Sequence, residues 1–388
     1  MELANMTLEI FSKLEQKWLY NGENNKKTRI LSIDGGSTDG IVAGSSLIHL
    51  EQQIRAKTGD PNSHIADFFD IIAGTGIGGI FATMLAADDG NGRPLYTAKD
   101  ALDFVTDRQS DLFNPTNVGV FRRRRRYSGR SMDKVLKEAL RREDGKLLTL
   151  KDTCKPLLIP CFDLNSSAPF VFSKADASES ASYDFDLWKV CRATSGTPSM
   201  FKPFPLTSVD EKTSCIAIDG GLVMNNPTSA AVTHVLHNKR DFPLVTGVED
   251  LLVLSLGNGP TMISPINPNL RHTSHCSTST VVEIACDGVS DTVDQLIGNA
   301  FCFNRSDYLR IQAYGTMAAP AVAGRRGMDG VLTEKGVETL PFGGKRLLTE
   351  TNGERIEGFV QRLMAMGKGS LPASPSKETA ISQLLNGR

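Results

Sequence analysis

The sequence predicts an α/β protein with a mostly parallel central sheet covered by helices on both faces. Apolar runs of strand length recur along the chain, and most are followed by a segment with helical spacing, which is the pattern of βαβ units. Three of these runs end in glycine-rich turns, beginning at Asp34, Gly74 and Asp219. In open α/β sheets, binding sites lie beyond the carboxyl ends of the strands, so we expect the site near these turns.

Composition limits the class of protein. The chain has 388 residues with 40% hydrophobic and 22% charged side chains, enough to bury a large core. The net charge of −1 gives no general attraction to nucleic acid. Seven scattered cysteines without a C-x-x-C pair favour reduced thiols in the cytoplasm. We find no signal-peptide pattern, and no run approaches the roughly 20 apolar residues that span a bilayer, so membrane contact is expected to be peripheral.

Residues 1–26 predict an N-terminal helical extension, because Leu8, Phe11, Leu14 and Trp18 follow helical spacing. A helix packed on the domain surface is favoured. A membrane-surface helix is the alternative, although its apolar face is short.

The first strand, residues 29–34, is followed by a glycine-rich turn over residues 35–40 and a helix over residues 41–55. Such a turn directs backbone N–H groups towards an anion, or is simply a tight connection. The G-x-G-x-x-G spacing of dinucleotide sites is absent, which argues against a nucleotide cofactor.

The second glycine turn, Gly74–Gly79, lies between a predicted strand over residues 68–73 and a predicted helix over residues 80–85. A strand, a tight turn and a buried helix form the frame of a nucleophile elbow, in which the middle residue of G-x-S-x-G carries the attacking hydroxyl. That middle residue is Gly76. The frame of a hydrolase is therefore present, but its attacking atom is missing.

Further strands and helices alternate to the end of the domain. Thr97 and Asp100 predict a capping box at a helix start. Other helices are expected over residues 131–142, 188–193, 225–235 and 281–300, strands over 156–164, 215–221 and 250–259, and a long polar loop over 260–280. We assign the main domain to residues 27–345, a C-terminal helix to residues 346–366 and a mobile tail to residues 367–388.

Charged and metal-binding side chains give weaker signals. Five consecutive arginines form a basic run: Arg122, Arg123, Arg124, Arg125 and Arg126. A solvated loop, contact with anionic lipid head groups and a nucleic-acid or import patch are all compatible with this run, and of the two functional interpretations lipid contact is favoured. The pairs His234/His237 and His272/His275 have no further ligand near them in sequence, so we expect no metal site.

Together the three glycine turns, Ala193-Thr194-Ser195, Asn225-Asn226-Pro227 and the stretch from Leu254 to Gly259 resemble the patatin-like phospholipase family of lipid acyl hydrolases. The resemblance covers residues 27–345. It implies the three-layer patatin fold, no cofactor or metal, and hydrolysis of phospholipid or galactolipid esters by a Ser–Asp dyad. The glycine at the elbow and the segment Trp188–Ser195 are similar to the plant group III subfamily.

Carried over by position, the resemblance implies that Asp219 is the dyad base and Gly76 occupies the nucleophile position. It implies an oxyanion turn made of Gly35, Gly36 and Ser37, with further motif residues Asp34, Asp39, Gly40, Gly74, Thr75, Ile77, Gly78, Gly220 and Gly221. Besides Gly76, two positions depart from the family pattern. Ser37 replaces a glycine, and Asp39 replaces an arginine, which puts a negative charge near a developing oxyanion.

Two hypotheses follow for the function. The first is a lipid acyl hydrolase that acts at membrane phospholipids or galactolipids, with activity that is weak, sustained by a water bound to Asp219, or absent. The second is an inactive lipid-binding or regulatory pseudoenzyme. A purely structural role for Asp219, as the cap of the following turn, is a third way to account for that residue.

Overall fold

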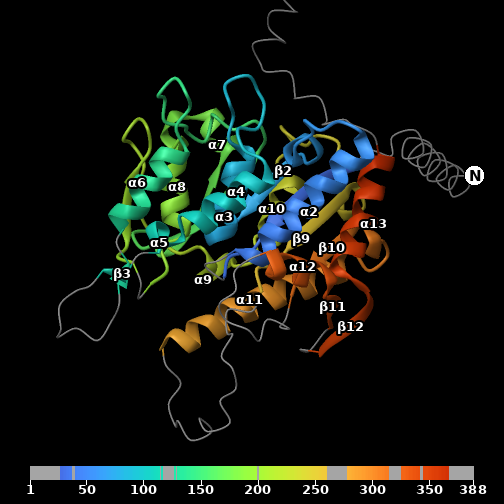
Figure 1. The fold of residues 1–388 in the computed structure, drawn as a ribbon. Coiled ribbons are helices and arrows are strands. Elements are labelled where there is room, and N and C mark those ends of the chain that lie inside the picture. Colours follow the sequence, from blue (N-terminus) through green and yellow to red (C-terminus); the bar gives the residue numbers. More distant parts are fainter. Residues whose placement is uncertain are drawn as a thin grey trace, which may run out of the picture.

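The computed structural model describes residues 27–36, 40–113, 115–116, 126–127, 129–198, 201–259, 278–313, 325–340 and 344–366. Its central element is an eight-stranded sheet in the order β10-β9-β1-β2-β5-β8-β7, with β6 paired to β5 (Figure 1). The strands are β1 (Thr28–Ile33), β2 (Ile71–Gly74), β5 (Leu157–Asp163), β6 (Ala168–Ser173), β7 (Phe204–Thr207), β8 (Ser214–Ile218), β9 (Leu251–Leu256) and β10 (Tyr308–Ile311).

The sheet is mixed but mostly parallel, as the sequence predicts. The five neighbours β10, β9, β1, β2 and β5 are parallel to one another. Strands β6 and β8 run antiparallel to β5, and β7 runs antiparallel to β8. The expected strands at residues 29–34, 156–164, 215–221 and 250–259 correspond to β1, β5, β8 and β9.

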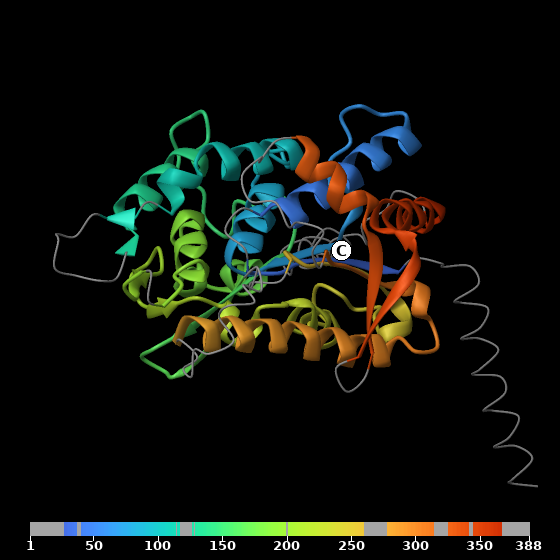
Figure 2. The same ribbon diagram turned by 60° about the horizontal axis from the view of Figure 1, so that its bottom comes forward.

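Helices cover both faces of the sheet (Figure 2). One layer contains α2 (Ile41–Thr58), α3 (Gly76–Ala86), α4 (Ala98–Asp107), α8 (Leu187–Thr194) and α13 (Asn352–Ala365), and the other contains α10 (Thr228–His237) and α11 (Thr278–Ala300). Alternating residues of β1 divide between two cores: Leu31 and Ile33 face the first layer, and Ile30 faces the second. The predicted three-layer arrangement is confirmed.

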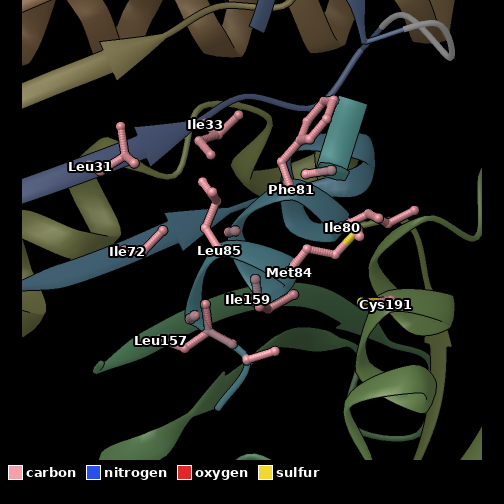
Figure 3. Packing of buried hydrophobic residues seen from close by; sticks show 14 of the residues in the cluster. Leu31, Ile33, Ile72, Ile80, Phe81, Met84, Leu85, Leu157, Ile159 and Cys191 are labelled. Carbon is pink, nitrogen blue, oxygen red and sulfur yellow. The ribbon is translucent and has the colours of Figure 1, made fainter. Parts of the chain in front are cut away.

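Helix α3 is the most deeply buried helix of the first layer. All of its residues are buried, which matches a segment that is apolar on every side. Figure 3 shows Phe81 and Leu85 of α3 packed against Ile33 of β1 and Ile72 of β2. This packing holds the start of α3 above the carboxyl ends of the two central strands.

Smaller elements complete the chain. Helix α4 begins with the predicted capping box, in which the Thr97 hydroxyl accepts from Asp100 N at 3.1 Å and the Asp100 carboxylate accepts from Thr97 N at 2.9 Å. The remaining helices and strands are α5 (Gln109–Leu112), α6 (Gly129–Ala139), α7 (Lys174–Glu179), α9 (Gly221–Met224), α12 (Arg325–Thr333), β3 (Pro115–Thr116), β4 (Arg126–Tyr127), β11 (Lys335–Leu340) and β12 (Gly344–Thr351).

Several boundaries differ from the sequence prediction. Helix α3 begins at Gly76 and not at residue 80, and α10 begins at Thr228 and not at residue 225. The second strand begins at Ile71, because Ile65–Phe68 forms a short 3-10 helix. Residues 346–351, which we assigned to the C-terminal helix, belong to β12; they are extended because β12 pairs with β11, a long-range contact that periodicity does not reveal. Helix α13 starts at Asn352 after a Thr351–Glu354 capping box.

Several predicted segments lie outside the described residues. These are the N-terminal extension 1–26, most of the polar loop, Arg122 to Arg125 and the tail 367–388, and Arg126 is described only as part of β4. None of the helices in the described ranges combines the length and hydropathy that crossing a bilayer requires.

The start of α3 approaches β1 so closely that no side chain fits between them. A Cβ atom at Gly78 would lie 2.3 Å from the carbonyl oxygen of Asp34 and 2.4 Å from that of Ile33. These neighbours are backbone atoms of the central strand and its turn, so they cannot move aside cheaply. By contrast, a Cβ at Gly288 of α11 would meet no atom within 4 Å.

We therefore predict opposite effects for the same substitution at these two positions. Gly78→Ala should destabilise the fold by about 3 kcal/mol or more, because it overpacks the elbow against backbone. Gly288→Ala should be neutral or stabilising by up to about 1 kcal/mol, since alanine has the higher helix propensity. The midpoint of urea-induced unfolding measures both, and equal midpoints for the two variants would contradict the close approach.

Candidate active site

Gly76 is the first residue of α3 and directly follows Thr75, whose backbone is extended. Gly76 has a φ of +56°, in the left-handed region that side-chain-bearing residues rarely occupy and that favours glycine. Its amide donates a hydrogen bond of 3.0 Å to the hydroxyl of Thr194. The Thr75 hydroxyl donates one of 2.7 Å to the carbonyl of Met224. The turn is thus fixed by contacts from two distant segments.

Asp219 lies beside the empty side-chain position of Gly76. A Cβ built on Gly76 would lie 4.0 Å from Asp219 Oδ1, 3.5 Å from Gly35 Cα and 3.9 Å from the Thr194 carbonyl oxygen. All three are ordinary van der Waals separations. Position 76 therefore has room for a serine side chain, which a strained left-handed backbone would carry. The serine hydroxyl would lie near an aspartate, which is the geometry of a nucleophile and its base.

Two hydrogen bonds hold the half-buried Asp219 carboxylate in this position. Thr197 Oγ1 donates to Oδ2 at 2.7 Å, and Gly221 N donates to Oδ1 at 2.8 Å. Burial raises the pKa of Asp219 above its ordinary value, and the bonds from Thr197 and Gly221 offset only part of that rise. The second bond also means that Asp219 caps the turn that follows it, so the structural and catalytic interpretations of this residue are compatible.

Asp219 reaches Gly76 by a route that differs from the sequence prediction. We expected the carboxyl ends of parallel strands to bring the two residues to one edge of the sheet. Strand β8 instead runs antiparallel to β5, with Phe162 opposite Ile218. This pairing is available because β5 has seven residues and β2 only four, so β5 extends past the end of β2. Asp219 follows β8 as it returns towards the elbow.

The end of α8 links the elbow to the aspartate turn. The carbonyl of Thr194, whose hydroxyl binds Gly76, accepts from Gly220 N at 3.3 Å. The carbonyl of Gly196 accepts from Asp219 N at 3.2 Å. The motif at Ala193–Ser195 therefore has a positioning role that its sequence alone did not reveal.

The predicted oxyanion turn is described only in part. The Gly35 amide donates to the Asn225 carbonyl at 2.9 Å, so this donor is already engaged. Gly36 is exposed, with a φ of +121°. Ser37 and Asp39 lie outside the described residues. Gly40 opens α2 with a φ of +61°.

Asp34 lies in a buried ion pair that sequence reasoning missed. Arg310 of β10 contacts both carboxylate oxygens, at 2.8 and 2.6 Å, and Ser290 donates a third bond at 3.3 Å. Burial alone would lower the pKa of Arg310, but the charge and hydrogen bonds of Asp34 outweigh it and raise that pKa. No spacing in the sequence marks Arg310, because it comes from a strand 276 residues away along the chain.

The other motif residues are structural. Gly74 and Gly78 form the close contact between β2, α3 and β1, and Ile77 belongs to the hydrophobic core. His234 lies 3.2 Å from the Asn238 side chain on α10. In the described part of the chain, no group of three or more His, Cys, Asp or Glu side chains is placed to hold a metal ion.

Two cavities lie away from the dyad position. A small one of about 80 Å³ is lined by Asp34, Gly35 and Asn225 among others. A larger one of about 700 Å³ lies at the β10 edge of the sheet. Neither is lined by Gly76 or Asp219.

Comparison with known proteins relates the chain to patatin-like proteins. The family model described as "Patatin-like phospholipase" matches residues 31–232. The chain is 66% identical, over 100% of both chains, to "Probable inactive patatin-like protein 9" of Arabidopsis thaliana. It is 44% identical to "Patatin-like protein 6" of the same plant, over 87% of this chain and 71% of that one. The solved structure of VipD from Legionella pneumophila covers 88% of this chain and 67% of its own, with 11% identity and a TM-score of 0.40, too distant to support an argument.

The raised pKa of Asp219 predicts a pH-dependent effect of Asp219→Asn. The unfolded carboxyl ionises near pH 4, and the folded one at higher pH, so the wild type loses stability as pH rises between the two values. The variant has no such loss. Its thermal midpoint should therefore exceed that of the wild type at pH 8, and the difference should shrink as the pH falls towards 4.

Asp163→Asn is the control of opposite sign. Hydrogen bonds from Ser166, Ile216 and Asn165 outweigh burial and lower the pKa of Asp163 to about 2. Ionised Asp163 therefore stabilises the fold, and its replacement should lower the midpoint at neutral pH. A lower midpoint for Asp219→Asn at pH 8 would contradict the raised pKa.

Proposed function

This chain belongs to the patatin-like phospholipase family, and on that premise we propose that it is a member that binds an ester lipid at the elbow without hydrolysing it. The observation that carries the proposal is the geometry at Gly76. The turn, the left-handed backbone and the facing aspartate are all present, but position 76 has no hydroxyl. Without a nucleophile no acyl-enzyme forms there.

The surroundings of Gly76 support binding without turnover. Gly35, a predicted oxyanion donor, already donates its N–H to Asn225. The scaffold around the missing hydroxyl is nevertheless intact, since Thr194 and Thr197 still position the elbow and Asp219. A relative that is 66% identical over its full length carries a name that describes it as inactive. These observations favour a lipid-binding or regulatory pseudoenzyme over an efficient hydrolase.

The lipid we propose is a membrane phospholipid or galactolipid, met by peripheral contact from the cytoplasmic side. The five arginines from Arg122 to Arg126 would then contact anionic head groups, each contributing about 1 kcal/mol near such a surface. This contact is a proposal from the sequence, because the side chains of the run lie outside the described residues.

A second candidate is slow hydrolysis by a water molecule in place of the serine hydroxyl. The missing side chain leaves a space whose nearest neighbours, Gly35 Cα, the Thr194 carbonyl oxygen and Asp219 Oδ1, lie 3.5, 3.9 and 4.0 Å from the Cβ position. A carboxylate whose pKa is raised by burial is a stronger base. Asp219 would take a proton from this water while the water oxygen attacks the ester carbonyl directly.

We predict that Gly76→Ser gains lipid-ester hydrolysis of several orders of magnitude, below the roughly 10⁶-fold that the nucleophile contributes in a serine protease, because the Gly35 N–H already binds Asn225. The measurement is fatty-acid release from phospholipid and galactolipid vesicles. Gly76→Ala is the matched control, because it adds the same Cβ without a hydroxyl and should stay inactive. The wild type should sediment with the vesicles and leave their lipid intact. A wild type that binds no vesicles would contradict the proposal.

The second candidate has its own test. Any lipid hydrolysis by the wild type should fall to the background rate in Asp219→Ala, because the water would lose its base. If the wild type hydrolyses lipid and Asp219→Ala does so equally well, water activation by Asp219 is wrong. Wild-type hydrolysis that disappears in Asp219→Ala would instead support this candidate and contradict binding without turnover.

A further inference from the structure

The cavity of about 700 Å³ lies at the far edge of the sheet from β7, against the edge strand β10. Helices α11 and α13 form two of its walls, and the β11–β12 hairpin forms another. Figure 2 shows this hairpin running between α13 on one side of the sheet and α11 on the other. Its volume falls within the roughly 300–1,000 Å³ of ordinary small-molecule sites.

One wall of the cavity holds an arginine whose buried nitrogen has no hydrogen-bond partner among the described residues. Arg355 of α13 forms no hydrogen bond or ion pair with any described residue, and its Nη1 atom is buried. The side chain lies against Gly336 of β11, where a Cβ would come within 2.7 Å of Nη1. A buried guanidinium nitrogen without a hydrogen-bond acceptor is costly, so this atom calls for an acceptor from solvent or from a ligand.

The other charges around the cavity are largely committed. Arg310 binds Asp34, Arg362 binds Asp307, and Arg346 binds Glu338. On the acidic side, Asp294 accepts from the Tyr308 hydroxyl and Glu354 caps α13. Arg355 and the exposed Arg305 are therefore the lining cations that form no ion pair with a described residue. Glu350 is the remaining acid, and its charge attracts Arg355 without a direct contact.

The uncharged part of the lining contains polar side chains, among them Gln295, Asn299 and Thr339, and a larger group of apolar ones. The apolar ones come from every wall: Phe301, Leu309, Val337, Leu340, Leu348 and Phe359. Phe301 and Phe359 are nearly inaccessible to solvent, with exposures of 2% and 3%. A cavity of this kind suits a ligand with one negative group and one long apolar chain.

We propose that this cavity binds a single-chain fatty acid, with its carboxylate on Arg355 and its chain along the aromatic and aliphatic walls. A guanidinium matches a carboxylate in shape and hydrogen-bond geometry, which makes this pair a strong one. The site is separate from the elbow, and the proposal holds whether or not the elbow binds lipid.

One glycine in the lining can be replaced by a larger residue that fills the cavity without straining the backbone. Gly298 of α11 lines it, and a Cβ there would meet no atom within 4 Å. Gly288 lies on the same helix, is equally open, and does not line the cavity. Gly298→Leu and Gly288→Leu therefore form a matched pair, one filling the cavity and one leaving it unchanged.

The experiment is a calorimetric titration of delipidated full-length protein with oleate, methyl oleate and inorganic phosphate. We expect the wild type to bind one oleate, to bind methyl oleate about tenfold or more weakly, and not to bind phosphate. Arg355→Met should weaken oleate binding about tenfold or more and leave methyl oleate binding unchanged, because it removes the charge but keeps the aliphatic stem. Gly298→Leu should abolish oleate binding, because it fills the cavity, and Gly288→Leu should match the wild type.

Three results would overturn the proposal. Oleate binding that survives in Gly298→Leu would place the ligand elsewhere, including at the elbow. Phosphate binding as tight as that of oleate would mark a plain anion site. No oleate binding by the wild type would leave only solvent as the partner of Arg355. Thermal unfolding of each variant shows that a loss of binding is not a loss of fold.

Discussion

The close approach of the α3 backbone to β1 is the constraint on which the rest of the site depends. Glycine at position 78 lets α3 start directly over the carbonyls of Ile33 and Asp34, with no room for a side chain. This contact fixes the position of Gly76 at the start of α3. Asp219 faces the elbow because β5 extends beyond the end of β2, and the antiparallel strand β8 pairs with this extension.

A second set of buried contacts joins the turn at Asp34 to the edge strand β10. Arg310 joins Asp34 to Ser255, and Ser255 lies 2.9 Å from the Thr228 hydroxyl of α10. Buried ion pairs recover their desolvation cost only with such complete hydrogen bonding. Arg310 also lines the large cavity, so this side chain connects the wall of the cavity to the turn at Asp34.

The protein retains the scaffold of an acyl-hydrolase site but lacks the nucleophilic hydroxyl. The features that shape an acyl-hydrolase site are retained: the left-handed turn, the aspartate beside it, and the two threonines that hold both in position. Glycine at position 76 lacks the CH₂OH group of a serine, and none of these features is disturbed, since the space for a Cβ remains free of clashes. Fold and function are therefore distinct questions here, and the fold alone does not imply catalysis.

The sequence by itself determined the α/β layers, the elbow and the absence of a hydroxyl at Gly76, because each follows from local periodicity and from residue identity. Only the tertiary structure decided that β8 is antiparallel, that Thr197 holds Asp219, that Arg310 neutralises Asp34, and that Arg355 lines a cavity with a buried nitrogen that has no hydrogen bond to a described residue. These are contacts between segments far apart in the chain. Strand direction and side-chain pairing over such separations are set by packing of the whole sheet, which no local pattern encodes.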